Sequence, residues 1–436
     1  MIKFVLFFLA SFATANLALA DGHEAAIADP AEISFVFNTL LFCIGGFLVM
    51  WMAAGFTMLE AGLVRSKNTV VICIKNLGLF SIAGVAYYLI GYNLMYAGVD
   101  GGYIGSISIW SSGIGSDSDL IGQDYSPASD WFFQMVFVAT TASIVSGALA
   151  ERVLIWPFLG FITILTAILY PISGSWQWGG GWLSEMGFSD FAGSTIVHSV
   201  GGWAALTGAI LLGSRKDKYD SNGNVNVMPG QSIPMATLGV WILWLGWFGF
   251  NGASQLALGS YADANAVATI FANTSMAAAG GIIAPMALSR LVYGKTDIAA
   301  TLNGAIAGLV SITAEPLTPS IGQAIIIGGI GGILCMYGMK LLDKLKIDDV
   351  VGAIPAHLIA GIWGTLVVPF TNADTSYVTQ IIGILAFGAF TVVCSSIVWS
   401  ILKVSVGIRA SDEDEEYGLD ITETGTSGYP EYVSKK

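Results

Sequence analysis

Charged residues are scarce in this sequence. Only 11% of the 436 residues are Asp, Glu, Lys or Arg, whereas 55% are hydrophobic. Soluble globular proteins carry roughly twice that charged fraction. The composition therefore excludes an ordinary soluble domain and predicts a polytopic membrane protein. The net charge of −13 and the lack of basic patches also exclude a nucleic-acid-binding protein.

Cysteine is rare as well. The four cysteines all lie inside apolar runs and lack metal-ligand spacing, so we interpret them as packing residues without a disulfide or a metal. They are Cys43, Cys73, Cys335 and Cys394. No nucleophile–base set or cofactor motif stands out, and we expect neither an enzyme nor a bound cofactor.

The N-terminal segment 1–20 has the pattern of a signal peptide. Lys3 is followed by an apolar run over 4–10 and by small residues at 18–20. Cleavage there places the mature N-terminus, near Asp21, outside the membrane; the alternative is an uncleaved first helix. We therefore divide the chain into a signal peptide 1–20, a transmembrane domain 21–406 and a cytoplasmic tail 407–436.

Eleven apolar runs follow, each near the roughly 20 residues that a helix needs to cross a bilayer. They cover 34–62, 69–97, 129–150, 153–173, 191–213, 233–255, 262–290, 298–314, 321–342, 350–370 and 377–406. The sequence thus predicts an all-α fold with eleven transmembrane helices.

Basic residues are absent from every second loop. The loops after the even-numbered spans contain no Lys or Arg. All basic residues of the mature chain fall on the other side of the membrane. The loops without Lys or Arg are 98–128, 174–189, 256–261, 315–320 and 371–376. By the positive-inside rule, the N-terminus is expected outside and the C-terminus in the cytoplasm.

Histidine occurs only three times, and both histidines of the hydrophobic body follow an aspartate by eight residues. His198 follows Asp190, and His357 follows Asp349. Eight helical residues rise roughly 12 Å, and half of the hydrocarbon core is about 15 Å thick. Both imidazoles are therefore predicted near the bilayer midplane, where an ionisable group indicates a functional site.

These two segments also suggest an internal repeat. Span 3 ends in Ser-Gly-Ala-Leu-Ala-Glu151 and span 8 in Ser-Ile-Thr-Ala-Glu315, an offset of 164 residues, against 159 for the two Asp–His segments. Spans 5 and 10 run in opposite directions. We expect a five-plus-five inverted repeat followed by a final helix, with the substrate site at the repeat interface.

Each candidate residue has a structural alternative. His198 and His357 either face each other in a narrow pore, where they can relay protons as neutral imidazoles, or bond separately to backbone carbonyls. A metal site is disfavoured because no third ligand is evident. Asp190 either caps its helix or attracts a cation with its charge. Asp349 fits the capping role better.

Aromatic residues and the tail leave similar choices open. Most of the 13 tryptophans fit the interfacial belts of a membrane protein. Aromatic residues near the outer ends, including Trp178 and the runs 132–137 and 247–251, could instead form an aromatic cage for a small cation. The acidic tail 411–436 is either disordered or a docking segment.

At these residues the chain resembles the ammonium transporter, methylammonium permease and Rhesus family. The motif Asp190-Phe-Ala-Gly-Ser-Thr-Ile-Val-His198 matches the family signature, and it is continued through 201–202 to 213–215. Further motifs lie at 60–65, 148–152, 246–251 and 348–349, so that the resemblance covers nearly the whole mature chain in order. The Asp-Phe-Ala-Gly form and Trp178 favour the Amt branch, of bacterial type, over the Rhesus branch.

The resemblance implies roles for individual residues. Trp178, Phe137 and Ser254 would form the outer ammonium site, with Asp190 as the buried carboxylate. Phe137 and Phe250 would stack as a gate above the pore. His198 and His357 would be the twin histidines. The resemblance also implies a homotrimer with one pore per subunit and a cytoplasmic tail, containing Gly418-Leu-Asp420, that can bind a PII-type regulatory protein.

The expected function is transport of ammonium, and of methylammonium, across the bacterial inner membrane. Ammonium would bind outside and lose a proton, and ammonia would pass the histidines while the proton crosses separately, so that transport is net electrogenic. The alternatives are an electroneutral channel for ammonia or carbon dioxide, as proposed for Rhesus proteins, and an ammonium sensor that signals through its tail.

Overall fold

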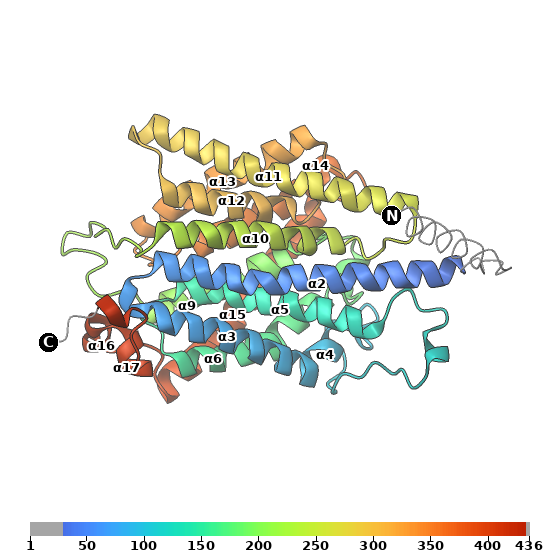
Figure 1. Cartoon of the computed structure of the whole chain (residues 1–436), viewed down its shortest axis with the longest axis horizontal. Helices are drawn as coiled ribbons and strands as arrows, with labels where there is room; N and C mark the ends of the chain where they lie inside the picture. Colours follow the sequence, from blue (N-terminus) through green and yellow to red (C-terminus); the bar gives the residue numbers. More distant parts are fainter. Residues whose placement is uncertain (1–28, 433–436) are drawn as a thin grey trace, which may run out of the picture.

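The structure is a computed structural model that describes residues 29–432. The predicted signal peptide and the last four residues lie outside this range. The described chain is helical and contains no β-strand beyond two isolated bridges. Its helices lie side by side along the long axis of the molecule (Figure 1). The longer ones are α2 (Pro30–Leu63), α3 (Thr69–Ala86), α5 (Pro127–Ala148), α6 (Ile155–Ile164), α9 (Val200–Leu212), α10 (Ile233–Ala253), α11 (Tyr261–Tyr293), α12 (Ile298–Ile312), α13 (Ile321–Lys344), α14 (Ala360–Thr371) and α15 (Tyr377–Ser405).

Shorter segments complete several of the spans. The segments η2, η4, η5 and η6 are π-helical, and η1, η3 and η7 are 3₁₀ turns. Their bounds are η1 (Ser66–Asn68), η2 (Tyr87–Gly91), α4 (Tyr92–Tyr96), η3 (Asp117–Leu120), η4 (Leu165–Leu169), α7 (Tyr170–Ser175), α8 (Trp182–Glu185), η5 (Ser194–Ser199), η6 (Ile354–Ile359), α16 (Asp412–Tyr417), α17 (Leu419–Thr424) and η7 (Pro430–Tyr432).

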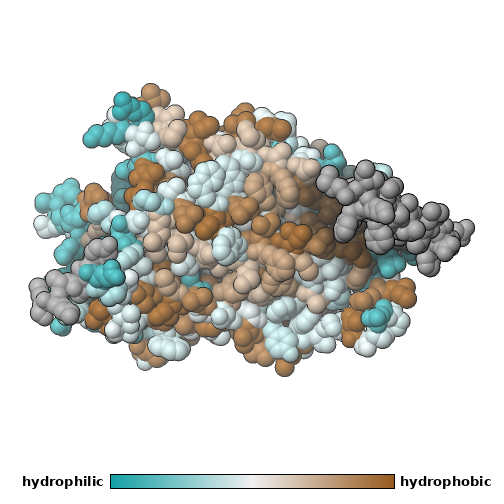
Figure 2. Space-filling view, viewed as in Figure 1, coloured by the Kyte–Doolittle hydropathy of each residue, from teal (hydrophilic) through white to brown (hydrophobic). Residues whose placement is uncertain are grey.

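The predicted spans agree with these helices. Among the described residues, ten helical segments are long and apolar enough to cross a membrane, and the 15-residue α12 is a shorter apolar helix. Each of the eleven coincides with one predicted run, with boundaries that differ by a few residues. Hydrophobic side chains cover the middle of the molecule, and hydrophilic ones gather mainly at the end that carries the C-terminal tail (Figure 2). The prediction of an all-α membrane protein is confirmed.

Glycine allows the closest helix pair to form. A Cβ atom on Gly62 of α2 would lie 2.4 Å from the backbone N of Ala236, and one on Gly239 of α10 would lie 2.4 Å from the backbone N of Leu59. Any larger residue would force α2 and α10, which lie next to each other in Figure 1, apart. Helix association in lipid relies on such close approach, because burial of apolar surface supplies no driving force there.

The C-terminal tail, as far as the structure describes it, packs against the body and is therefore not a disordered segment. Asp420 Oδ1 accepts the Val71 N–H at 2.9 Å in the first turn of α3, and Glu423 Oε2 accepts the Ile155 N–H at 2.7 Å at the start of α6. Lys67 Nζ donates to the Glu415 carbonyl at 2.8 Å. Two helix N-termini, whose first N–H groups have no partner inside the helix, are thus capped by the tail. Figure 1 shows α16 and α17 at the end of α3.

A buried ionic cluster, formed by Arg215, Asp348, Glu151 and Arg65, joins the inner loops. Arg215 donates from Nε and Nη2 to Asp348 at 2.8 and 2.9 Å, and from Nη1 to Glu151 at 2.8 Å. Arg65 Nε donates to Glu151 at 2.9 Å. Arg215 follows the end of α9, whereas Asp348 precedes the start of η6. The two histidine-bearing spans therefore run in opposite directions, as the sequence predicts.

Candidate functional site

Asp190 caps the span that carries His198. Its Oδ1 accepts the N–H groups of Gly193 and Ser194 at 3.1 and 2.8 Å, and its Oδ2 accepts those of Thr195 and Ile196 at 2.8 and 2.9 Å. The side chain is fully buried. The first N–H groups of a helix have no intrahelical acceptor, so the carboxylate satisfies four donors that burial would otherwise leave unpaired. This geometry matches the capping alternative for Asp190.

Asp349 does the same at the start of the other histidine-bearing span. It accepts the N–H groups of Gly352, Ala353 and Ile354 at 3.0, 3.2 and 2.7 Å. In both segments the glycine three residues after the aspartate has a positive φ, +106° at Gly193 and +80° at Gly352. That conformation strains any residue with a side chain. The repeated local structure, at the same offset as the two histidines, supports the inverted repeat.

Both histidines lie in π-helical turns. His198 belongs to η5 and His357 to η6, and each turn continues directly into the α-helix that follows, α9 or α14. A π-turn holds one residue more than an α-turn, and such turns are frequent at functional sites. Here each turn is placed between an aspartate cap and a regular helix, which fixes the direction of its imidazole.

The two imidazoles meet. His198 Nδ1 and His357 Nδ1 lie 3.2 Å apart, and the rings are nearly parallel, with centroids 5.2 Å apart and an angle of 27°. Both residues are buried. The structure thus brings the two imidazoles together edge to edge and not into separate backbone contacts.

A hydrogen bond between two Nδ1 atoms fixes the tautomers relative to each other. One ring donates from Nδ1 and leaves its Nε2 as a bare acceptor; the other accepts at Nδ1 and carries its proton on Nε2. The pair therefore offers one donor and one acceptor at its two Nε2 atoms. Within the described residues, the Nε2 atom of His198 is buried without a hydrogen-bond partner. It is free to bond a small solute.

Aromatic rings hold His198 in place. The imidazole stacks on Trp247, with centroids 4.9 Å apart at 21°, and it lies 5.2 Å from Phe250. Trp247 is itself fixed by its indole N–H, which donates to Thr313 Oγ1 at 2.8 Å. Because this wall is apolar, a solute beside His198 can make polar contacts there only with the nitrogens of the imidazole.

Two phenylalanines close the path above the histidines. The rings of Phe137 on α5 and Phe250 on α10 stack with centroids 4.0 Å apart at 21°. Both side chains are buried. The sequence predicted this pair as a gate, and the structure brings the two rings into direct contact.

A vestibule of about 410 Å³ lies outside the phenylalanine pair. Phe137, Trp178 and Ser254, the three residues expected at the outer cation site, all line it. The ring of Trp178 stands edge-on to Phe137, with centroids 5.9 Å apart, and its N–H donates to the Asp190 carbonyl at 2.9 Å. Asp190 is not among the lining residues, so its carboxylate acts on this space only through its charge and its cap.

Two further cavities continue the path on the inner side. One of about 10 Å³, roughly the room of one water molecule, is lined by His357, Phe56, Glu60 and Asn303. The next, of about 140 Å³, shares Asn303 with it. The vestibule, the two phenylalanines, the two histidines and these cavities therefore follow one another across the protein.

Glu60 lies in the motif at 60–65, and the sequence alone indicates no role for it. It is fully buried, and its Oε2 accepts the Ser146 hydroxyl at 2.7 Å, while Lys75 Nζ donates to the Ser146 carbonyl at 3.0 Å. The sequence contains a signal for this site, because Glu60 and Lys75 are charged residues inside apolar runs. Charge at such depth is costly and marks a functional or paired position.

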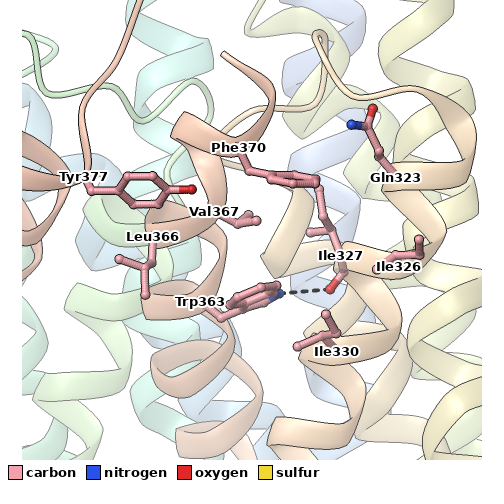
Figure 3. A pocket seen from close by; sticks show the side chains of 9 residues that line it. All are labelled: Gln323, Ile326, Ile327, Ile330, Trp363, Leu366, Val367, Phe370 and Tyr377. Atoms are coloured by element: carbon pink, nitrogen blue, oxygen red, sulfur yellow. Dashed lines mark hydrogen bonds between the residues drawn. The ribbon is translucent and has the colours of Figure 1, made fainter. Parts of the chain in front are cut away.

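A further cavity of about 410 Å³, as large as the vestibule, lies away from this path, between α13 and α14 (Figure 3). Its walls are almost entirely apolar, and the indole N–H of Trp363 turns to the Ile327 carbonyl at 3.0 Å. None of the residues that line it is charged. It therefore lacks the groups that a small cation needs.

The sequence and the fold both match known transporters. The profile of the Ammonium Transporter Family matches residues 40–429. A putative ammonium transporter of Synechocystis sp. is 40% identical over 430 residues, which cover 97% of this chain and 95% of that protein. Ammonium transporter Amt2 of Archaeoglobus fulgidus is 40% identical over 462 residues, with coverage of 98% and 95%.

Solved structures give the same result. A protein described as a sensor Amt protein superposes with a TM-score of 0.84 at 33% identity, covering 90% of this chain and 99% of that one. Mep2 of Candida albicans superposes with a TM-score of 0.78 at 25% identity, covering 93% of each chain. With its apolar helices and near-full-length matches, this chain is a multi-pass membrane protein and not an enzyme, and it belongs to the ammonium transporter family.

Proposed function

We propose that this protein takes up ammonium by binding it in the vestibule, removing a proton at the phenylalanine gate and passing ammonia along the histidine pair. The observation that carries the proposal is the single file of vestibule, stacked Phe137 and Phe250, paired His198 and His357, and a cavity of about 10 Å³ below them. A space of that size fits one dehydrated small molecule and not a hydrated ion.

The vestibule suits a small cation with hydrogen-bond donors. Ring faces attract a cation, and here Phe137 and Trp178 stand next to each other in the wall. Ammonium that enters an apolar constriction as an ion would meet a high free-energy cost, because charge is poorly solvated there. Loss of a proton removes this cost. Potassium, similar in size, has no proton to lose and is rejected.

The histidine pair then handles the neutral molecule and the proton separately. Ammonia can donate to the bare Nε2 of one ring and accept from the Nε2–H of the other. The proton that ammonium loses passes to the bare Nε2 of one ring. The Nδ1 proton of that ring then moves along the 3.2 Å hydrogen bond to the other Nδ1, and the Nε2 proton of the second ring leaves on the inner side, which reverses the two tautomers. Net movement of one charge with each ammonia follows, so uptake is electrogenic.

The setting of the protein follows the same argument. We place it in the bacterial inner membrane with the N-terminus outside, after removal of the signal peptide 1–20, and with the tail in the cytoplasm, because the basic residues lie on the side of the tail. We further propose a homotrimer, and a PII-type protein as partner of the docked tail. The mass of the purified protein tests the homotrimer, and a pull-down with such a regulator tests the partner.

Two other functions remain in competition. An electroneutral channel would use the same vestibule and histidines but carry no current. A sensor is favoured by one observation, namely the superposition on a protein described as a sensor Amt protein. A sensing protein would bind ammonium and change the position of its tail without net uptake.

The test combines uptake and current in the same cells. Cells that lack their own ammonium transport are given the wild-type chain, and methylammonium uptake and ammonium-evoked current are recorded under voltage clamp. We expect both signals to saturate with concentration. Uptake without current would refute the electrogenic mechanism, and loss of both signals in a correctly inserted protein would favour the sensor.

Substitution of the pair tests its role. His198→Ala should reduce uptake more than tenfold or admit potassium, because it removes the polar contact above the small cavity. The matched control is Trp363→Phe, an aromatic substitution at a partly buried residue in the cavity of Figure 3, which should leave uptake unchanged. Normal uptake and normal exclusion of potassium in His198→Ala would contradict the proposed path.

A further inference from the structure

The vestibule has a second, polar wall that the proposed mechanism does not use. Besides the aromatic cage it is lined by Tyr92, Tyr96, Asp130, Gln134 and Gln177. Asp130 is the one carboxylate among the described residues that line this space. A half-buried acid at the mouth of an apolar path raises the question of what it binds.

The contacts of Asp130 leave part of its carboxylate free. The Tyr92 hydroxyl donates to its Oδ2, and Gln134 Nε2 donates to its Oδ1 at 3.4 Å. An ionised carboxylate offers about four acceptor positions, so about two remain for a bound cation.

Two other polar atoms in the same wall lack partners. Among the described residues, the hydroxyl of Tyr96 and the carbonyl oxygen of Gln177 are buried without a hydrogen bond. An unpaired buried polar atom costs free energy. The Gln177 oxygen is an acceptor only, so it needs a donor from a bound molecule. The rings of Tyr92 and Tyr96, with centroids 5.1 Å apart, stand beside it.

Position along α5 places this wall outside the aromatic cage. Asp130, Gln134 and Phe137 are separated by four and three residues and lie on one face of the helix. Seven residues correspond to a rise of roughly 10 Å. A cation at Asp130 therefore lies about two helical turns further out than one at Phe137.

We propose that Asp130, with Gln177 and the hydroxyls of Tyr92 and Tyr96, forms a separate outer station that captures ammonium before it reaches Trp178 and Phe137. This inference rests on the function proposed above. The chemistry is complementary: the station supplies one negative charge and several acceptors, and ammonium supplies one positive charge and four N–H donors. Neutral ammonia would gain little from the charge.

Asp130 also has a structural explanation that the experiment must separate. It lies in the first turn of α5, where a negative charge is favourable next to free N–H groups. Asp130→Asn keeps an acceptor for Tyr92 and removes only the charge. A merely structural role predicts lower stability and unchanged ammonium dependence, whereas capture predicts a change in the concentration dependence.

The experiment measures ammonium-evoked current, or methylammonium uptake, against concentration. For Asp130→Asn we expect the half-saturating concentration to rise at least about tenfold, because the charge in direct contact with the captured cation is removed, with the maximal rate unchanged. Asp124→Asn is the matched control, because this exposed acid in the loop just before α5 does not line the vestibule. It should behave as wild type.

Further variants keep the proposal falsifiable if Asp130→Asn fails to fold. Gln177→Leu removes the unpartnered acceptor without breaking a hydrogen bond in the protein, and it should raise the half-saturating concentration several-fold. Tyr92→Phe should do the same. Unchanged half-saturation in a folded Asp130→Asn, or in both other variants, overturns the station while leaving the proposed function intact. A wild-type protein without uptake or current would instead refute the proposed function.

Discussion

Arg215 is predicted to be the most consequential single residue for stability outside the pore. Its side chain is 3% exposed and makes charged hydrogen bonds to Asp348 and Glu151, both of whose side chains are 0% exposed. Arg215→Met preserves most of the side-chain volume but removes the guanidinium. Two buried carboxylates then lose their main positive partner. Because Arg215 follows α9 and Asp348 precedes η6, the change also loosens the relative position of the two histidine-bearing spans.

The size of the effect follows from burial. Removal of one partner from a buried ion pair typically costs about 3–5 kcal/mol, because the other charge stays desolvated. An exposed pair contributes less than about 1 kcal/mol. The neighbouring Lys216 provides this comparison within the same loop, since its side chain and that of Glu416 are 36% and 74% exposed. Lys216→Met is therefore a matched control for the loss of one positive charge.

Thermal unfolding of the purified proteins in detergent measures the difference. We expect Arg215→Met to lower the midpoint strongly and Lys216→Met to leave it nearly unchanged. Transport by Arg215→Met, measured at a temperature where the protein is folded, should fall as well, because the histidines are held less firmly. Equal midpoints for the two variants would refute the view that burial makes the Arg215 cluster strong.

Two more predictions concern the Asp190 cap and the loss of stability at acidic pH. Asp190→Ala leaves four buried N–H groups without an acceptor, so it should cost at least about 2 kcal/mol and abolish uptake; a folded variant with normal uptake would contradict this. Burial alone would raise the pKa of Glu151 and Asp348, but the guanidinium of Arg215 outweighs it and holds the pKa of both below its usual value. Their stabilisation is thus complete above the unfolded carboxyl pKa of about 4 and is lost as pH falls below it. The wild-type midpoint should decline there, and that of Arg215→Met less steeply.

Local patterns predicted the helices well because the bilayer imposes a simple rule. Each apolar run must form a helix to satisfy its backbone, so hydropathy is enough to locate it. The starts of the histidine spans were less accurate. Regular helical structure begins at Ser194 and Ile354, several residues after the predicted boundaries. Asp190 and Asp349 hold the intervening backbone in a cap with a glycine at positive φ, which hydropathy does not register.

Other features depended on residues far apart in the chain. Asp130 lies in α5 and Gln177 in the loop after α7, and the sequence around each contains nothing that indicates a shared wall. The docking of the tail depends on Asp420 and Glu423 reaching the first turns of α3 and α6. The acidic run of the tail was compatible with disorder, because composition does not reveal which helix ends lack acceptors.

The sequence by itself determined the membrane class and the positions and alternating directions of the spans. These depend on the length, polarity and charge of continuous segments, and the bilayer converts them into geometry. Only the tertiary structure decided that His198 and His357 share a 3.2 Å hydrogen bond, that Phe137 covers Phe250, and that Asp190 uses both oxygens as a cap. Those facts depend on the packing of α5, α10 and the two π-turns, where contacts between distant segments set the distances and angles.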